Sequence, residues 1–210
     1  MLIDLIYPPV CGFCNKINKK YLCKKCEINI KPYEIYSINK CPNKYFEYKI
    51  DILKYENIVR KCILEYKFNE KSYMHKTFEK IILKNKKIYS FLKKYDIIIY
   101  VPMYAKKKFS RGYNQAELIA RDLSTTLGIQ LEKNNLIKVL DTKKQSTLTK
   151  TERKQNVKDV FEVTKPEKLQ NKKVILFDDI YTTGSTANEC SKVLKNAGAK
   201  EIAVLTIAKD

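Results

Sequence analysis

The feature that most constrains the fold is a pair of apolar runs separated by a helical pattern in residues 174–207. Residues 174–177 read VILF, a continuous apolar run typical of a strand buried on both faces. Apolar side chains recur with helical spacing over residues 187–197, and residues 202–207 form a second apolar run. A strand, a helix and a second strand in this order form a βαβ unit of a parallel sheet. We therefore predict an α/β fold with a doubly wound parallel sheet and helices on its faces.

The preceding part of the chain supplies further elements for this domain. Residues 96–101 are almost entirely apolar and predict another buried strand. Residues 57–94 have a mostly helical pattern, and residues 115–127 predict an amphipathic helix. Residues 106–114 predict a basic loop. Residues 141–156 are polar and offer little core, so they form either a mobile functional loop or an exposed helix.

Length and composition fit one main domain with a small appendage. The chain has 210 residues, of which 44% are hydrophobic and 31% are charged, so it can bury enough apolar surface to fold. We place a small module at residues 1–45 and the main domain at residues 46–210. The apolar residues 1–10 are too few to span a membrane and lack the features of a secretory leader. We therefore expect a cytoplasmic protein without membrane insertion.

Two CxxC pairs lie in the predicted module, Cys11 with Cys14 and Cys23 with Cys26. Two residues inside a pair allow both sulfurs to face one point, and two such pairs complete a tetrahedron around Zn²⁺. Disulfides are disfavoured in a reduced cytosol, and a redox-active CxxC would not need a second copy. We predict a structural zinc site, because four thiolates leave no open coordination position for catalysis. Gly12 is expected to ease the tight turn of the first pair.

The remaining cysteines and the single histidine are not assigned to this site. Cys62 and Cys190 lie in helical apolar patterns and are predicted to be small buried side chains. Cys41 is not followed by a metal-binding partner at a suitable spacing. His75 lies among lysines, and we expect a solvated surface histidine there.

Between the two strands of the βαβ unit, the chain combines acids, hydroxyls and one glycine. Asp178 and Asp179 directly follow the apolar run, and ligands bind at the carboxyl ends of the strands in open parallel sheets. The next turn leads into the predicted helix, whose free N–H groups and positive dipole end favour an anion. We predict that this turn binds a phosphate through Thr182, Thr183, Gly184, Ser185 and Thr186.

The paired carboxylates need a different ligand group, because they repel a phosphate. They suit vicinal ribose hydroxyls, which donate hydrogen bonds, or a Mg²⁺ held beside such a sugar. Neighbouring strand residues face opposite sides, but both acids can turn to one edge if the strand ends there. The residues therefore predict a ribose-phosphate site. The alternative is that Ser185 or Thr186 only caps the helix and that the acids are solvated.

The segment VILFDDIYTTGST resembles the phosphoribosyl pyrophosphate (PRPP) signature of type I phosphoribosyltransferases. The chain as a whole is similar to one branch of that superfamily, the ComF family of competence and DNA-utilisation proteins. The matching features, in chain order, are the two CxxC pairs, Tyr55, YKF at residues 66–68, Val101 with Pro102, RGYNQ at residues 111–115, Gln145, Arg153, Asn156 with Val157, and Phe161. Many members carry a further CxxC, where this chain has only Cys41, so a second metal is not expected.

The resemblance implies roles for the residues around the signature. Asp178 and Asp179 would hold the ribose hydroxyls of PRPP and would be the catalytic carboxylates if turnover occurs. Residues 182–186 would bind the 5′-phosphate. Mg²⁺ bound with PRPP would help to stabilise the departing pyrophosphate.

The resemblance also implies roles for basic residues and for the RGYNQ motif. Arg111, together with residues 106–108, would neutralise pyrophosphate, and Lys67 would be a further substrate-binding residue. Residues 113–115 either form a wall of the pocket or begin a helix.

The formal net charge of +19 attracts polyanions such as nucleic acid, although the lysine-rich composition also fits an AT-rich coding bias. The resemblance implies a PRPP-binding protein of DNA uptake and natural transformation, with single-stranded DNA and a competence helicase or other DNA-processing protein as partners. Two alternatives stay open at this point. One is a phosphoribosyltransferase acting on a small-molecule acceptor, and the other is a PRPP-sensing module without turnover.

Overall fold

A computed structural model describes residues 8–69, 71–140 and 159–210 of the chain. Its sheet has six strands in the order β1-β2-β8-β7-β3-β4, and a separate antiparallel pair joins β5 to β6. The strands are β1 (Glu34–Lys40), β2 (Tyr48–Lys54), β3 (Ile97–Tyr100), β4 (Gln130–Leu131), β5 (Leu136–Lys138), β6 (Phe161–Val163), β7 (Lys173–Tyr181) and β8 (Glu201–Lys209). The α-helices are α2 (Lys24–Ile30), α3 (Asn57–Phe68), α4 (His75–Leu83), α5 (Lys86–Leu92), α6 (Ala105–Arg111), α7 (Gln115–Leu127) and α9 (Ser185–Asn196).

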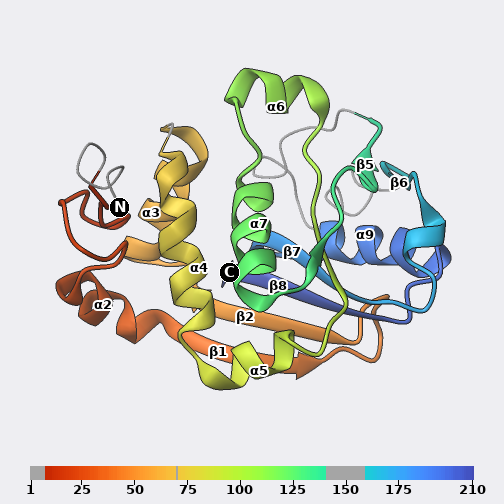
Figure 1. Cartoon of the computed structure of the whole chain (residues 1–210), viewed down its shortest axis with the longest axis horizontal. Coiled ribbons are helices and arrows are strands. Elements are labelled where there is room, and N and C mark those ends of the chain that lie inside the picture. The colour runs from red at the N-terminus through yellow and green to blue at the C-terminus, as the bar shows by residue number, and fades with distance from the viewer. Residues whose placement is uncertain (1–7, 70, 141–158) are drawn as a thin grey trace.

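The five strands from β2 to β4 run parallel, and β1 is an antiparallel edge strand. The predicted βαβ unit is confirmed as β7, α9 and β8, and the predicted buried strand at residues 96–101 is confirmed as β3. Helices cover both faces of the sheet, with α3, α4 and α7 in front of it in Figure 1. The predicted doubly wound α/β fold is therefore confirmed.

The two faces of the sheet carry two separate hydrophobic cores. Along β7, Ile175 and Phe177 face the core shared with α3, α4 and α7. Val174 and Leu176 face the opposite core, which includes Cys190 of α9. This alternation follows from the two-residue period of a strand, and it decides where the acids that follow Phe177 can point.

Two features differ from the pattern expected of the sequence. Strands β1 and β2 occupy residues 34–54, where no strand was predicted, and the predicted domain boundary falls in the loop that joins them. Both strands belong to the large sheet. Residues 105–111 form the helix α6, which overlaps the segment 106–114 that was predicted to be a basic loop. The division into residues 1–45 and 46–210 stays a prediction.

In the described ranges, no helix has both the length and the apolar character needed to cross a membrane. The polar segment at residues 141–156 lies outside the described residues, as do Gln145, Arg153, Asn156 and Val157 of the motif set.

Candidate functional site

The β7–α9 turn (residues 182–186) connects the carboxyl end of β7 to the first turn of α9. Gly184 occupies the N-cap position in the left-handed conformation, with φ 73° and ψ 8°, which glycine adopts at little cost. The hydroxyls of Thr183 and Ser185 are 2.9 Å apart, and the N–H of Ser185 donates to the Thr183 hydroxyl at 3.4 Å. No side chain caps the helix at Gly184. The amino end of α9, with its positive dipole end, and several hydroxyls therefore meet in this turn, an arrangement suited to an anion.

Asp178 and Asp179 lie within β7 and not beyond its end, because β7 stays paired with β8 as far as Tyr181. Asp179 points toward α3, where the Lys67 ammonium is 2.7 Å from its Oδ2. Asp178 continues the face of Val174 and Leu176 by strand alternation, and the backbone N–H of Asp179 donates to its Oδ1 at 2.8 Å. The strand continues past both acids, and the charge of Asp179 still acts on the Asp178 carboxyl, so a shared role of the two carboxylates at one edge stays a prediction.

The surroundings of Asp178 shift the pKa of its carboxyl. Burial opposes its ionisation, and so does the neighbouring charge of Asp179, while Lys67 offsets only part of this. The pKa of Asp178 is therefore raised to about 7. Carboxyls perturbed by both burial and a like charge are frequent at functional sites. Near neutral pH, a small change in the surroundings of this carboxyl is enough to change its charge.

The RGYNQ motif contributes the first residues of α7. Asn114 is the N-cap, and its side chain accepts a hydrogen bond from the N–H of Ala116 at 3.0 Å. The Asn114 amide also donates to the carbonyl of Val101 at 3.2 Å, in the segment that follows β3. Of the two alternatives for residues 113–115, the helix start is therefore confirmed for Asn114 and Gln115.

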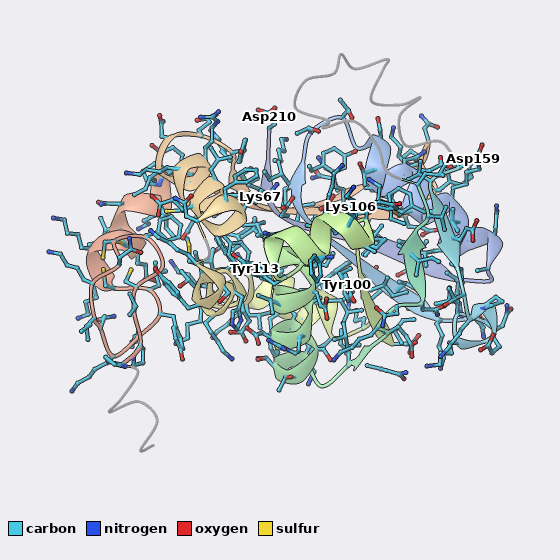
Figure 2. The ribbon with its side chains drawn as sticks, turned by 90° about the horizontal axis from the view of Figure 1, so that it is seen from above. Lys67, Tyr100, Lys106, Tyr113, Asp159 and Asp210 are labelled. Carbon is cyan, nitrogen blue, oxygen red and sulfur yellow. The ribbon has the colours of Figure 1, made fainter. Side chains whose placement is uncertain are left out.

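The same motif also holds the last turn of α3. The Tyr113 hydroxyl donates to the carbonyl of Tyr66 at 2.7 Å, and the Gln115 side chain donates to the carbonyl of Lys67 at 3.2 Å. In return, the Tyr66 hydroxyl donates to the carbonyl of Gln115 at 2.9 Å. Figure 2 labels Lys67, on α3, and Tyr113, in the segment just before α7. RGYNQ and YKF thus form one hydrogen-bonded unit that fixes the backbone at Lys67, and Lys67 in turn contacts Asp179.

Helix α6 follows Val101 and Pro102 and stands away from the body of the sheet in Figure 1. It carries the exposed side chains of Lys106, labelled in Figure 2, and Phe109, which is 92% exposed. The side chains of Arg111 and Lys108 lie outside the described part of the structure. Their predicted contact with pyrophosphate therefore stays a prediction.

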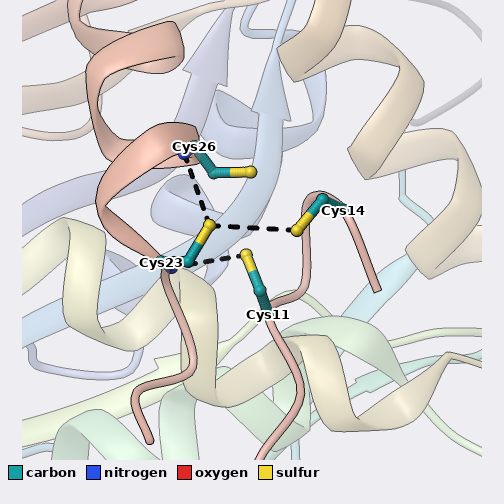
Figure 3. Close-up of side chains that lie close together, drawn as sticks. All are labelled: Cys11, Cys14, Cys23 and Cys26. Atoms are coloured by element: carbon teal, nitrogen blue, oxygen red, sulfur yellow. Dashed lines mark hydrogen bonds between the residues drawn. The ribbon is translucent and has the colours of Figure 1, made fainter. Parts of the chain in front are cut away.

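The four cysteines of the predicted zinc site come together. The sulfurs of Cys11, Cys14, Cys23 and Cys26 all lie within 4.8 Å of one another, as Figure 3 shows. The sulfurs of Cys14 and Cys23 are 3.8 Å apart. Because Zn–S bonds are about 2.3 Å, tetrahedral coordination places two sulfurs about 3.8 Å apart. The cluster therefore has the donor set and the size that zinc requires.

Ionisation of these thiols is strongly unequal in the absence of a cation. Burial alone would raise the pKa of Cys11, but backbone N–H groups, that of Cys23 first among them, lower it to about 7. Burial raises the pKa of Cys26 well above its usual range, and contacts with the other three cysteines raise it further. Four thiolates this close repel one another, so a dication that binds all four supplies the missing compensation.

The metal module packs tightly against α4 through Gly12. The N–H of Gly12 donates to the Thr77 hydroxyl at 3.3 Å, and that hydroxyl donates to the carbonyl of Tyr21 at 2.6 Å. A Cβ at Gly12 would lie 2.6 Å from the Thr77 Oγ1, which is too close for an ordinary contact. Glycine is thus required here by the close approach of α4, a reason that the CGFC turn alone did not indicate.

His75 differs from the solvated histidine expected from the sequence. It is largely buried and hydrogen-bonds through Nδ1 to Asp122 of α7, while the Lys76 ammonium lies 3.4 Å from the other oxygen of that carboxylate. Burial would raise the pKa of Asp122, but these two partners lower it overall. The contact ties α4 to α7, and sequence spacing gave no signal for it because the partner lies on a distant element.

A shallow groove of about 360 Å³ runs along the outer surface of α3. Arg60, Lys61 and Phe68 are exposed on it, and 63% of the Phe68 surface is accessible. The full lining is Asn57, Arg60, Lys61, Leu64, Glu65, Phe68 and Asn69. Glu65 is paired with Lys71 at 2.7 Å, so the groove presents a net positive charge.

Comparisons with known proteins agree with this arrangement. Residues 111–210 match the phosphoribosyl transferase domain family, a range that includes RGYNQ, both acids and the β7–α9 turn. The chain is 32% identical over 206 residues to competence protein F of Haemophilus influenzae, a match that covers 96% of this chain and 85% of that protein.

Two further relatives have a lower sequence identity to this chain. DNA utilization protein YhgH of Shigella flexneri is 25% identical, with 95% of this chain and 90% of that protein covered. Competence protein ComFC of Streptococcus pneumoniae is 29% identical, with 75% of this chain and 66% of that protein covered. The length of the match to competence protein F, the phosphoribosyl transferase domain and the parallel sheet together place this chain in the ComF family of the type I phosphoribosyltransferase superfamily.

Proposed function

We propose that this protein binds PRPP at the carboxyl end of β7. The observation that carries the proposal is the β7–α9 turn, where a left-handed glycine and several hydroxyls lie at the first turn of a helix. This turn binds the 5′-phosphate through its N–H groups and hydroxyls. The nearby carboxylates of Asp178 and Asp179 bind the ribose, and no side chain of the turn carries a negative charge that would repel the phosphate.

Lys67 has a defined part in this proposal. Its ammonium neutralises Asp179 at 2.7 Å, and its position is fixed by the contacts of Tyr113 and Gln115 with the end of α3. On ligand binding, Asp179 exchanges the ammonium for ribose hydroxyls, and Lys67 turns to the pyrophosphate together with Arg111. Asp178 and Asp179 are also the residues that would hold a Mg²⁺ beside the sugar, where it would neutralise part of the pyrophosphate charge.

Group transfer at this site would break the bond between C1 of the ribose and the pyrophosphate oxygen. Pyrophosphate leaves with the bonding electrons, the acceptor forms the new bond to C1, and the acceptor's proton passes to solvent or to a base. The carboxylates stabilise the positive charge that develops on the sugar ring. Pyrophosphate release that depends on an added acceptor identifies a transferase, whereas PRPP binding without release identifies a sensing module.

PRPP is expected to raise the melting temperature of the protein, and the size of the rise is expected to depend on pH. At a ligand concentration of about 100 Kd, the stabilisation is about 2.7 kcal/mol, or about 5–10 °C for a chain of this size. Because the pKa of Asp178 is raised to about 7, a proton must leave this carboxyl before it accepts a ligand hydroxyl or Mg²⁺. The affinity should therefore fall about tenfold between pH 8 and pH 6.

Thermal unfolding with PRPP and Mg²⁺ at pH 6, 7 and 8 checks this expectation. The variant Asp178→Asn serves as the control, since the ligand's own phosphates still titrate while this carboxyl does not. The difference between the two pH profiles isolates Asp178. Identical profiles would remove Asp178 from the site, and the absence of any PRPP-dependent shift would contradict the proposed function.

We further propose that the protein acts in DNA uptake and binds single-stranded DNA. Its relatives include proteins named for competence and for DNA utilization, and its net charge is +19. The groove along α3 has Arg60, Lys61 and the exposed ring of Phe68 in its lining, with the two cations about two helical turns from the ring. Cations that follow a backbone and an aromatic ring on which a base can stack are the usual means of binding single strands without sequence preference.

Replacing Arg60 and Lys61 with Gln should weaken single-stranded DNA binding and flatten its salt dependence. Each lost phosphate contact lowers the slope of log K against log salt by about 0.7, so the double variant should lose about 1.4. The matched control is Lys86→Gln/Lys87→Gln, which removes the same charge from exposed positions on α5, away from α3 in Figure 1. Equal losses in the two double variants would show that only total charge matters and would exclude the α3 groove.

A further inference from the structure

Two charged residues on β2 form a buried ion pair that the site as described does not use. Asp51 has an exposed fraction of 0%, and the Lys49 ammonium lies 2.8 Å from its Oδ2. The Thr206 hydroxyl of β8 donates to the other oxygen of Asp51 at 3.2 Å. Burying such a pair carries a large desolvation cost and contributes little net stability. Because the pair contributes little net stability, we looked for a role of Asp51 and Lys49 other than stabilising the fold.

Lys49 makes a second contact, with the last residue of β7. Its ammonium lies 4.4 Å from the centre of the Tyr181 ring, within the range of a cation–π interaction. Because Asp51 holds the Lys49 ammonium in place, this ammonium is a fixed cation that contacts the Tyr181 ring. The side chain of Tyr181 is partly buried in the α9-side core.

Tyr181 in turn contacts the β7–α9 turn at Gly184. A Cβ placed on Gly184 would lie 2.1 Å from the Tyr181 hydroxyl oxygen and 2.4 Å from the ring carbon that carries it. The end of this side chain therefore rests directly against the Gly184 backbone. Gly184 is also the residue whose left-handed conformation turns the chain from β7 into α9, so a change at Tyr181 would alter the direction of the first N–H groups of the helix.

We infer that Tyr181 and Lys49 are positioning residues that hold the β7–α9 turn in its anion-binding shape. The order of contacts is Asp51, Lys49, Tyr181 and Gly184. The inference rests on the proposed function, since it assumes that the turn binds a phosphomonoester. These contacts reach the turn from the β2 side of β7, whereas Lys67 approaches Asp179 from α3. Their effect should fall on the sugar phosphate and not on the pyrophosphate.

Separate titrations of the full chain with ribose 5-phosphate and with inorganic pyrophosphate, both with Mg²⁺, test this inference. Tyr181→Leu should lower the affinity for ribose 5-phosphate about tenfold and leave the affinity for pyrophosphate within about twofold. Lys49→Arg keeps the cation, so this variant should retain a near-normal affinity for ribose 5-phosphate. The double variant Lys49→Met/Asp51→Asn removes the cation without leaving a buried charge unpaired, and should reproduce the selective loss.

The control is Lys93→Met, which removes another cation above a tyrosine ring, that of Tyr89 at 5.9 Å, on α5. It should change neither affinity. The inference is overturned, while the proposed function stands, if Tyr181→Leu binds ribose 5-phosphate with normal affinity. The same holds if this variant loses affinity for both ligands equally. Unmodified protein that binds neither PRPP nor ribose 5-phosphate overturns the proposed function and this inference with it.

Discussion

Gly184→Ala is expected to abolish most PRPP binding, with a loss of affinity well above tenfold. An alanine here meets two obstacles at once. The left-handed conformation costs a non-glycine residue about 1 kcal/mol, and the new methyl group would overlap the Tyr181 hydroxyl, which lies 2.1 Å from the Cβ position. Either Tyr181 or the turn must move, and both movements disturb the N–H groups that bind the phosphate. Direct titration with PRPP measures the loss.

The chain offers a closely matched control for this substitution. Gly128 ends α7 with nearly the same backbone, φ 68°, and a Cβ there would have no atom within 4 Å. Gly128→Ala should therefore cost about 1 kcal/mol of stability and leave PRPP binding unchanged. Equal PRPP affinity in the two alanine variants would show that the β7–α9 turn is not where the ligand binds.

Loss of zinc is the second change for which a large effect is expected. We expect the purified protein to contain one equivalent of zinc, and Cys23→Ser to reduce it sharply. Structural zinc sites contribute about 10–16 kcal/mol of apparent binding energy in small modules. Without the metal, the four sulfurs lose the group that offsets their repulsion, and the contacts of Gly12 with Thr77 and Tyr21 should loosen. Metal analysis and limited proteolysis measure the two effects.

Cys41→Ser is the control for the zinc prediction, because Cys41 lies in the β1–β2 loop, outside the four-cysteine cluster. It should retain the full zinc content and the protease resistance of the unmodified chain. Protein that is isolated without metal and resists proteolysis equally before and after chelation would contradict a structural zinc site at Cys11, Cys14, Cys23 and Cys26.

The part of the fold that follows from local patterns could be predicted from the sequence. Helix α7 covers residues 115–127, as predicted, because an apolar stripe and a terminal glycine, Gly128, specify it locally. The buried strands β3, β7 and β8 could be predicted because each contains a continuous apolar run. Strand β2 lacks such a run, because its sequence YKIDILK mixes charges with apolar residues, and its buried Asp51 contacts Lys49 and Thr206.

In the candidate site, too, the features close in sequence could be predicted and the contacts between distant residues could not. The acids, the hydroxyls and the glycine of residues 178–186 lie together in sequence and were found from it. That Asp178 and Asp179 lie inside a paired strand was not found from it, because this depends on how far β7 stays paired with β8. The contacts of Lys67 with Asp179, and of Tyr181 with Lys49, join residues that only the folded chain brings together. No spacing rule in one sequence can indicate them.

Calorimetric titration measures directly whether Asp178, Asp179 and the β7–α9 turn bind PRPP. PRPP with Mg²⁺ should bind the unmodified chain at one site and should bind the variant Asp178→Asn/Asp179→Asn far more weakly. The variant loses two negative charges, so non-specific attraction of a polyanion would instead strengthen its binding. PRPP binding at this site would be contradicted if the variant bound PRPP with full or greater affinity, or if titration of the unmodified chain gave no heat.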